Sequence, residues 1–125
     1  KETMKLISTN ICKTSDIGVN DNLFGGTMLA WLDVAGGILA SSACKSNNVI
    51  TLKMDEVLFK KPVKVKDLVR IYGRVNHLGI TSVNLSLEAR RVNLTKNTED
   101  MVCSTTMIYV RVDGEGKPEA ISKAN

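Results

Sequence analysis

Asp33 is the one charged residue in a long apolar segment. Asp21 and Lys45 are the nearest charged residues on either side, and the residues between them are mostly Leu, Ile, Val, Ala and Gly. A carboxylate among apolar residues loses hydration energy, so it must find partners or serve in chemistry. Asp33 is therefore either a base or nucleophile, or a structural carboxylate that holds a backbone or hydroxyl group.

The other reactive side chains suggest less chemistry. His77 is the sole histidine, and no Cys or Asp stands near it at metal-ligand spacing. Cys12, Cys44 and Cys103 are odd in number and widely spaced, which indicates free thiols in a reducing cytosol and no disulfide or metal site. No Gly-x-Ser-x-Gly elbow, P-loop or dinucleotide fingerprint occurs. We therefore expect a cytoplasmic protein without a metal centre or a Ser-His-Asp triad.

A helix is expected to carry Asp33. It should begin around Gly25–Thr27, after a polar loop over residues 9–22, and run to about Ala43–Lys45, where Ser46-Asn47-Asn48 stops it. Its roughly 18 residues would span about 27 Å, enough to cross a small domain. Asp33 should lie near its middle.

Strands are expected to follow the helix. The expected ranges are a possible short strand at 5–8, then 49–59, 68–75, 81–92 and 101–112. The third of these long strands alternates cleanly, with one apolar face made of Val83, Leu85, Leu87 and Ala89. In the last strand the corresponding face is expected to be Val102, Ile108, Val110 and Val112.

One apolar helix followed by four long strands predicts an α+β fold, with an antiparallel meander packed on the helix. A helix that is apolar almost all round cannot be covered by one sheet face. We therefore expect the sheet to curl around the helix, or a second copy of the chain to cover the remainder.

The length of 125 residues fits one domain with one core. We expect this domain to occupy residues 3–118, followed by a mobile tail over 119–125. The segment 23–44 is long enough to span a membrane, but a charge at its centre would be costly there. Because the remaining strands alternate and no signal peptide is visible, we expect a buried helix and no membrane association.

The net charge of +4 arises locally. Between Lys53 and Arg74 there are seven basic and three acidic residues, a difference equal to the net charge of the whole chain. Such a stretch suits an anionic partner, although it can also be an ordinary solvated face. No aromatic residues are interleaved for base stacking, so we do not expect a nucleic-acid partner.

An ordered set of motifs resembles a known family. The sequence Asn22-Leu23-Phe24-Gly25-Gly26 is followed after seven residues by Asp33 and then by Ala35-Gly36-Gly37. Further matching segments lie at 59–63, 67–69, 79–82 and 113–118. Together they resemble the acyl-CoA thioesterases of the hotdog fold, above all the bacterial YciA-type enzymes, and each half of the mammalian cytosolic acyl-CoA hydrolases.

The resemblance implies a long central helix wrapped by a curved antiparallel sheet. It also implies hydrolysis of acyl-CoA to a free carboxylic acid and coenzyme A, with no required cofactor, since coenzyme A is part of the substrate. The family forms dimers that often trimerise, so a homodimer and a trimer of dimers, a hexamer, are expected.

Two catalytic positions follow from the resemblance. Asp33 matches the helix carboxylate that the family uses as general base or nucleophile. Asn22 matches the polar residue before the Leu-Phe-Gly-Gly step, which in two-domain relatives works with an Asp of the other hotdog unit. YciA-type enzymes can carry Asp there, so Asn22 departs from that pattern. We expect Asn22 of one protomer to face Asp33 of another.

The glycine pair at the helix start fits thioester chemistry. Bare backbone at Gly25-Gly26 would let a carbonyl approach the N–H groups where the helix dipole favours negative charge. We expect the Gly26 region to bind the oxyanion, while Asn22 orients the water or the carbonyl. Close helix–sheet packing is the alternative reason for these glycines, and it is the preferred reason for Gly36-Gly37.

Coenzyme A carries phosphates, so a basic groove with hydroxyl donors is expected. The candidate residues for binding it are Gly25, Lys60, Lys61, Gly79, Thr81, Ser82, Arg90 and Arg91.

Two alternative functions remain at this stage. A non-catalytic acyl-CoA-binding or regulatory protein could use the same groove. A hotdog hydroxyacyl-thioester dehydratase is less well supported, because such enzymes use a His near the helix and His77 is predicted to follow a strand.

Overall fold

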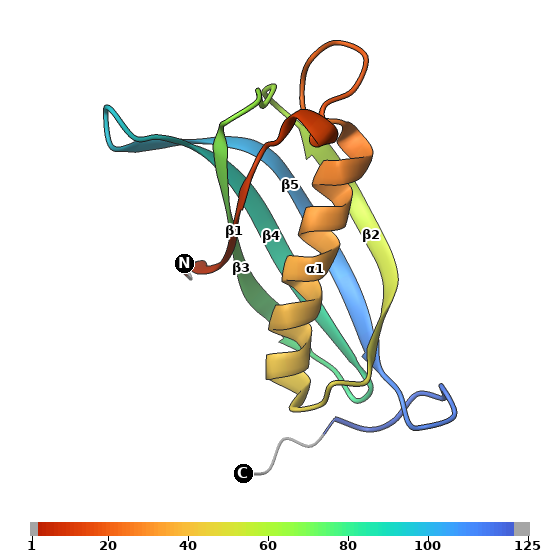
Figure 1. Ribbon diagram of the computed structural model, residues 1–125. Helices are drawn as coiled ribbons and strands as arrows, with labels where there is room; N and C mark the ends of the chain where they lie inside the picture. Colours follow the sequence, from red (N-terminus) through yellow and green to blue (C-terminus); the bar gives the residue numbers. More distant parts are fainter. Residues whose placement is uncertain (1–2, 122–125) are drawn as a thin grey trace.

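The computed structural model describes residues 3–121, in which one α-helix packs on a five-stranded antiparallel sheet (Figure 1). The elements in chain order are β1 (Lys5–Ile11), a short 3-10 helix η1 (Thr14–Asp16), α1 (Gly25–Cys44), β2 (Val49–Phe59), β3 (Leu68–Leu78), β4 (Ser82–Asn93) and β5 (Thr98–Arg111). The α+β class and the long central helix are confirmed.

The strand order is β1-β3-β4-β5-β2, with all pairs antiparallel. Strands β3, β4 and β5 form a meander, but the prediction that β2 belongs to the same meander is wrong. The Lys60 N–H donates to the Val102 carbonyl of β5 (2.7 Å), so the chain is still tied to β5 as it leaves β2. Pro62 then interrupts the ladder, and the chain crosses to the opposite side of the sheet.

Most element bounds agree with the sequence pattern. The helix and β2 have the expected bounds, whereas β1 and β3 continue to Ile11 and Leu78. The predicted turn over 93–100 is shorter, because Asn93 pairs with Thr98 and only residues 94–97 connect the strands. Asn97 has a φ of 55°, a left-handed conformation that Asn adopts more readily than most residues.

The core lies between α1 and the concave face of the sheet. The helix contributes seven buried residues, namely Met28, Leu32, Ala35, Gly36, Leu39, Ala40 and Cys44. The predicted inward face of β4 is confirmed, since Val83, Leu85, Leu87 and Ala89 are all buried. The three cysteines are free and buried.

Three of the four residues predicted for the apolar face of the last strand, Val102, Val110 and Val112, are buried. Met107 and Tyr109 point toward the helix, while Ile108 is only partly buried. Two polar residues, Thr105 and Tyr109, stand on the inner face and disguise its alternation. Thr105 is tolerated there because its hydroxyl donates to the Asp55 carbonyl (2.8 Å).

The end of the described chain is attached to the sheet. The Glu119 N–H donates to the Arg111 carbonyl (2.8 Å), and the Ile121 N–H donates to the Ile80 carbonyl (2.7 Å). Residues 119–121, expected in the mobile tail, are therefore held by the sheet. The rest of that predicted tail lies outside the described residues.

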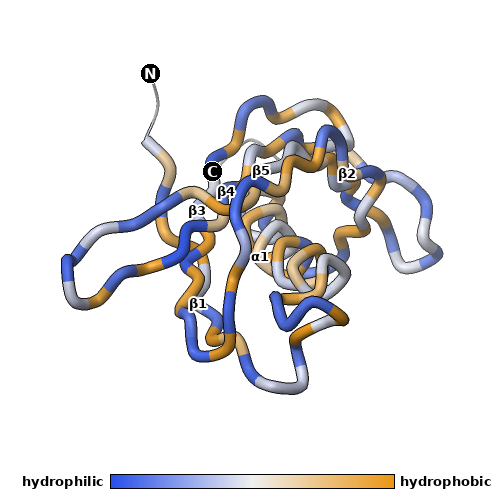
Figure 2. The backbone as a smooth tube through the Cα atoms, turned by 90° about the horizontal axis from the view of Figure 1, so that it is seen from above, coloured by the Kyte–Doolittle hydropathy of each residue, from blue (hydrophilic) through white to orange (hydrophobic). Residues whose placement is uncertain are grey.

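By length and composition alone, α1 could cross a membrane. In the folded chain, however, one side of the helix forms the core with the sheet. The sheet curves partly around the helix, with β1 and β2 on either side of it, and residue hydropathy alternates along the strands (Figure 2).

The outer side of the protein carries an apolar surface, which we call the α1/β2 face. Its helix residues, at helical spacing, are Val34 and Ile38, and along β2 it includes Ile50, Leu52, Leu58 and Phe59, which lie on both sides of that edge strand, all about half exposed or more. Because β2 is an edge strand, its free backbone edge lies beside these side chains.

Helix packing at Gly36 gives a stability prediction. A Cβ on Gly36 would overlap the Tyr109 hydroxyl and lie 2.9 Å from its Cε1, whereas a Cβ on Gly37 would have Tyr109 Cε2 at 4.0 Å. Gly36→Ala should therefore lower the free energy of unfolding by about 1–3 kcal/mol. The matched Gly37→Ala should not lower it, because Ala favours helix over Gly by about 1 kcal/mol. Urea denaturation measures both, and equal losses would contradict the packing argument.

Candidate active site

Asp33 lies in the middle of α1, on the exposed side of the helix. Two hydroxyl groups donate to its Oδ1 atom, from Thr51 (2.7 Å) and from Tyr109 (2.8 Å). The expectation of a carboxylate enclosed by apolar residues is wrong for the single chain. Leu32 and Ala35 are buried in the core, whereas Val34 is exposed beside Asp33, and the carboxylate is held by two donors.

The two donors come from neighbouring strands. Thr51 on β2 and Tyr109 on β5 are directly paired across the sheet, so the ladder places their hydroxyls side by side below the helix. Both residues were missed in the sequence. A tyrosine in the alternating strand 101–112 of a chain with only 4% aromatic residues was the available signal.

Tyr109 is buried beneath the carboxylate. Its hydroxyl also lies 2.6 Å from the main-chain carbonyl oxygen of Asp33. Burial raises the pKa of Tyr109 above its usual value, and the hydrogen bond and negative charge of Asp33 raise it further. The phenol is therefore protonated at neutral pH and acts as a donor.

Asp33 opens onto a shallow cavity of about 570 Å³ on the outer side of α1. The other residues that line this cavity are Val34, Gly37, Ile38, Ser41, Asn47, Val49, Thr51 and Tyr109. It overlaps the α1/β2 face at Val34 and Ile38, so the carboxylate stands within the apolar surface that the chain leaves uncovered.

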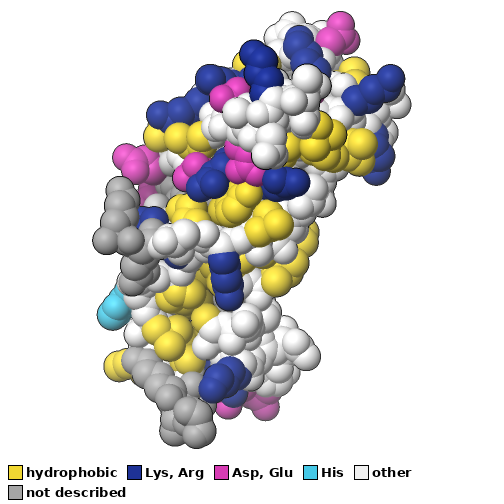
Figure 3. Space-filling view, turned by 90° about the vertical axis from the view of Figure 1, so that its left-hand side faces the viewer, with side chains coloured by type: hydrophobic (Ala, Val, Ile, Leu, Met, Phe, Trp, Pro, Cys, Tyr) yellow, Lys and Arg dark blue, Asp and Glu magenta, His cyan; other side chains and the backbone are white. Residues whose placement is uncertain are grey.

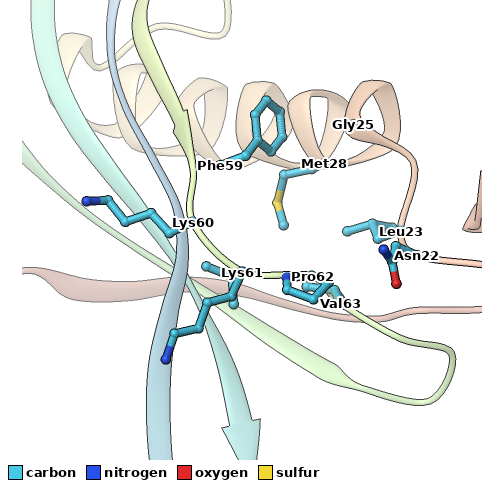
Figure 4. Close-up of a pocket in the computed structure, with 10 residues that line it drawn as sticks. Asn22, Leu23, Gly25, Met28, Phe59, Lys60, Lys61, Pro62 and Val63 are labelled. Atoms are coloured by element: carbon cyan, nitrogen blue, oxygen red, sulfur yellow. The ribbon is translucent and has the colours of Figure 1, made fainter. Parts of the chain in front are cut away.

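Asn22 lies in a different cavity, of about 390 Å³, at the start of the helix (Figure 4). The other lining residues are Leu23, Gly25, Met28, Phe59, Lys60, Lys61, Pro62, Val63 and Val102. The main-chain carbonyl of Asn22 accepts from the Gly18 N–H (2.8 Å), but its buried side-chain Oδ1 has no hydrogen-bond partner among the described residues. This amide oxygen is thus an unsatisfied acceptor at the wall of the cavity.

Asn22 and Asp33 cannot meet within one chain. Asp33 stands eight residues beyond Gly25, which places it about 12 Å further along the helix axis. The two residues line separate cavities. The structure of the single chain therefore does not bring the two predicted catalytic side chains together.

Gly25 and Gly26 form the first turn of α1, as expected. A Cβ on Gly26 would lie 2.6 Å from the Phe24 ring, and one on Gly25 would have the Phe59 ring at 3.6 Å. Gly26 therefore packs against its own segment and not against the sheet. Within the described chain, no acceptor pairs with either N–H group, as is usual at a helix start.

Some predicted coenzyme A residues lie near Asn22. Lys60 and Lys61 line its cavity, but their side chains extend away from Asn22 and Met28 in Figure 4. Arg91 donates to the Pro62 carbonyl (2.7 Å), so it belongs to the same end of the molecule.

The other predicted binding residues are not brought to this cavity. Thr81 accepts from Arg111, whose neighbour Val112 donates to Asn48 beyond the end of α1, so the turn with Gly79 and Ser82 lies at the opposite end of the helix (Figure 1). Arg90 lies over the Tyr72 ring at 4.0 Å and donates to Glu88 (2.9 Å).

Basic side chains gather toward the upper end of the face shown in Figure 3, with acidic side chains among them. Several are already paired, as Arg70 is with Glu99 (2.8 Å) and Arg91 with Asp100 (3.2 Å). The local positive charge of the sequence is thus partly neutralised in the fold.

His77 lies on β3 and is exposed, away from the helix. A dehydratase that relies on a helix-region His receives no support from this position. In residues 3–121, no group of three or more His, Cys, Asp and Glu side chains is arranged to hold a metal ion.

Comparisons with known proteins agree on one family. Residues 20–96 match the family model described as the thioesterase superfamily. The chain is 30% identical to the acyl-CoA thioester hydrolase YciA of Escherichia coli over 119 residues, which covers 93% of this chain and 89% of the relative.

Solved structures give the same result. A hexameric hotdog fold thioesterase of Campylobacter jejuni has a TM-score of 0.83 and 31% identity, covering 94% of this chain and 90% of that one. An acyl-CoA hydrolase of Staphylococcus aureus, in complex with butyryl coenzyme A and coenzyme A, has a TM-score of 0.85 and 26% identity, covering 91% and 69%. The chain therefore belongs to the thioesterase superfamily, as an acyl-CoA thioester hydrolase of the YciA type with the hotdog fold.

Proposed function

We propose that Asp33 is the general base or nucleophile of this hydrolase, in a site completed by Asn22 of a second copy of the chain. The observation that carries the proposal is the separation of two incomplete half-sites. Asp33 is oriented by two hydroxyls on an uncovered surface, and Asn22 has an unpaired amide oxygen in another cavity.

The α1/β2 face supports the second copy. An exposed edge strand beside exposed apolar side chains is a template for pairing with another chain. A two-fold axis that pairs the β2 edges of two copies would lay their helices side by side and antiparallel. The helix start of one copy, with Asn22, would then approach the middle of the other helix, with Asp33.

A larger assembly is also proposed. The Campylobacter jejuni relative is hexameric. A trimer of the dimers described above would keep the same paired half-sites, because the dimer contact uses only the α1/β2 face.

The proposed chemistry is attack of water or of Asp33 on the thioester carbonyl carbon. As general base, Asp33 takes the water proton while the new C–O bond forms, and it returns that proton to the sulfur as the C–S bond breaks, which releases coenzyme A as its thiol. Negative charge that develops on the carbonyl oxygen is stabilised by the free N–H groups at the start of α1, near Gly26. Asn22 orients the water or the carbonyl.

Coenzyme A is proposed to enter beside the cavity of Asn22. Lys60 and Lys61 at its rim supply positive charge for phosphates. The bound coenzyme A of the Staphylococcus aureus relative supports a ligand of this class. Thr81 and Ser82 would contribute only from another copy, because they lie at the opposite end of α1 from Asn22.

Replacing Asp33 tests the reaction. Asp33→Ala should reduce kcat by about 10²–10⁴-fold, since a positioned base contributes that much. Thiol release from acyl-CoAs of different chain lengths, from acetyl to palmitoyl, is the measurement. Wild-type turnover by the variant would refute the role of Asp33, whereas binding without turnover by the wild-type protein would favour the binding-module alternative.

Mixing two inactive variants tests the shared site. When Asp33→Ala and Asn22→Ala chains are dissociated together and reassembled at random, half of the dimers are mixed and each has one intact site, so about a quarter of the wild-type activity should return. Each variant reassembled alone is the control. No recovery in assemblies shown to be mixed would refute the arrangement.

Thr51 gives a further prediction. Thr51→Val removes one donor to Asp33, and because a hydrogen bond to a charged group is worth about 1.5–3 kcal/mol, kcat should fall about 10-fold or more. Thr51→Ser retains the hydroxyl and should keep near-normal turnover. Equal losses in both variants would show that the methyl packing, and not the donor, matters.

We also propose that turnover requires no metal ion, because Asp33, Asn22 and the helix N–H groups supply the base and the donors that the reaction needs. Extensive dialysis against a chelator should leave kcat unchanged. A loss of activity that a divalent cation restores would contradict this proposal.

A further inference from the structure

Tyr109 combines deep burial with contact to the reacting residue. Its side chain is only 2% exposed, yet its hydroxyl reaches both the side chain and the main chain of Asp33. A buried hydroxyl costs desolvation energy unless it is hydrogen-bonded, so this one is anchored to Asp33.

We propose that Tyr109 is a positioning residue that holds Asp33 by Oδ1 and thereby presents Oδ2 as the oxygen that reacts. This inference rests on the proposed catalytic role of Asp33. In this arrangement Oδ1 is the anchored oxygen and Oδ2 is the reacting oxygen. Tyr109 itself need not touch the substrate.

The two carboxylate oxygens have different surroundings. Oδ1 accepts from the Thr51 hydroxyl (2.7 Å) and shares the single Tyr109 hydroxyl proton (2.8 Å) with the Asp33 main-chain carbonyl oxygen. No described residue donates to Oδ2. Proton transfer or nucleophilic attack therefore uses Oδ2, at the exposed side of the helix.

The contact with the main chain makes the restraint specific. Because one hydroxyl lies 2.6 Å from the Asp33 carbonyl oxygen and 2.8 Å from Oδ1, it relates the carboxylate directly to the helix backbone. Rotation of the Asp33 side chain to another rotamer would break the contact with Oδ1 while the contact with the carbonyl remained. The carboxylate is thus preorganised before the substrate arrives.

Gly36 creates the space that this arrangement needs. A Cβ there would overlap the Tyr109 hydroxyl and lie within 3.0 Å of its ring, so any larger residue would push the tyrosine away from the helix. The glycine one turn beyond Asp33 is therefore more than a packing residue. It lets the buried strand reach the carboxylate.

The test compares two tyrosines that each donate to a carboxylate. Tyr109→Phe keeps the ring and removes the hydroxyl below Asp33. Tyr72→Phe, the control, removes a donor to Glu99 (2.9 Å) on β5 and keeps the ring beneath Arg90. Tyr109→Phe should lower kcat by about 10- to 100-fold with an unchanged KM, because misplacing a catalytic group carries a cost of this order. Tyr72→Phe should leave both parameters unchanged.

A second comparison separates positioning from other roles. Asp33→Asn alone tests the role of Asp33, and wild-type turnover by it would overturn the proposed function. If that variant is impaired, adding Tyr109→Phe to it should cause no further loss of the residual rate. An equal further loss, or wild-type kcat in Tyr109→Phe alone, would overturn the inference about Tyr109 while the role of Asp33 stood.

Folding is checked in the same variants. Urea unfolding and assembly size should show that Tyr109→Phe remains folded and associated. If its kcat loss were matched by an equal loss of folded protein, the tyrosine would be structural and the inference wrong.

Discussion

The burial of one side of α1 against the concave sheet determines where the functional groups lie. Seven helix residues enter the core, and this fixes which residues face outward. Since the helix is apolar almost all round, its outer side is also apolar, and Asp33 stands in it beside Val34 and Ile38. The same packing brings the helix close enough to the sheet for the Tyr109 hydroxyl to reach the main-chain carbonyl of Asp33.

The site divides its requirements between local and distant parts of the molecule. Orientation of the carboxylate is provided within one chain by two paired strands, β2 and β5. In the proposed mechanism, stabilisation of the oxyanion and placement of the water use the helix start, about 12 Å away along α1. The start and the middle of one straight helix cannot come together. A second copy of the chain can supply the helix start, and this would complete the proposed site.

Much of the fold could be predicted because its signals are local. The bounds of α1 follow from a polar loop before it and a polar stop after it, and β4 shows an uninterrupted alternation. The inner face of β5 could not be predicted in the same way, because Thr105 and Tyr109 are polar in type but buried by tertiary contacts.

The position of Asp33 could be predicted, but its partners could not. Its isolation among apolar residues and the glycine pair before it are visible in the sequence. Thr51 becomes its neighbour only because β2 crosses to the edge beside β5 and pairs with Tyr109, 58 positions further along the chain. No local pattern encodes such a pairing. The residues for binding coenzyme A were likewise expected in one groove, whereas the fold places Thr81 and Ser82 at the opposite end of the molecule from Lys60 and Lys61.

In the proposed shared site, the free edge of β2 would link catalysis to the amount of protein present. If each site needs two copies, the fraction of working sites follows the dissociation constant of the assembly and falls on dilution, although every chain remains folded. Specific activity would then vary with concentration in a way that ordinary enzyme kinetics does not anticipate. The cell could also adjust hydrolysis through the abundance of this one chain, without a separate regulator.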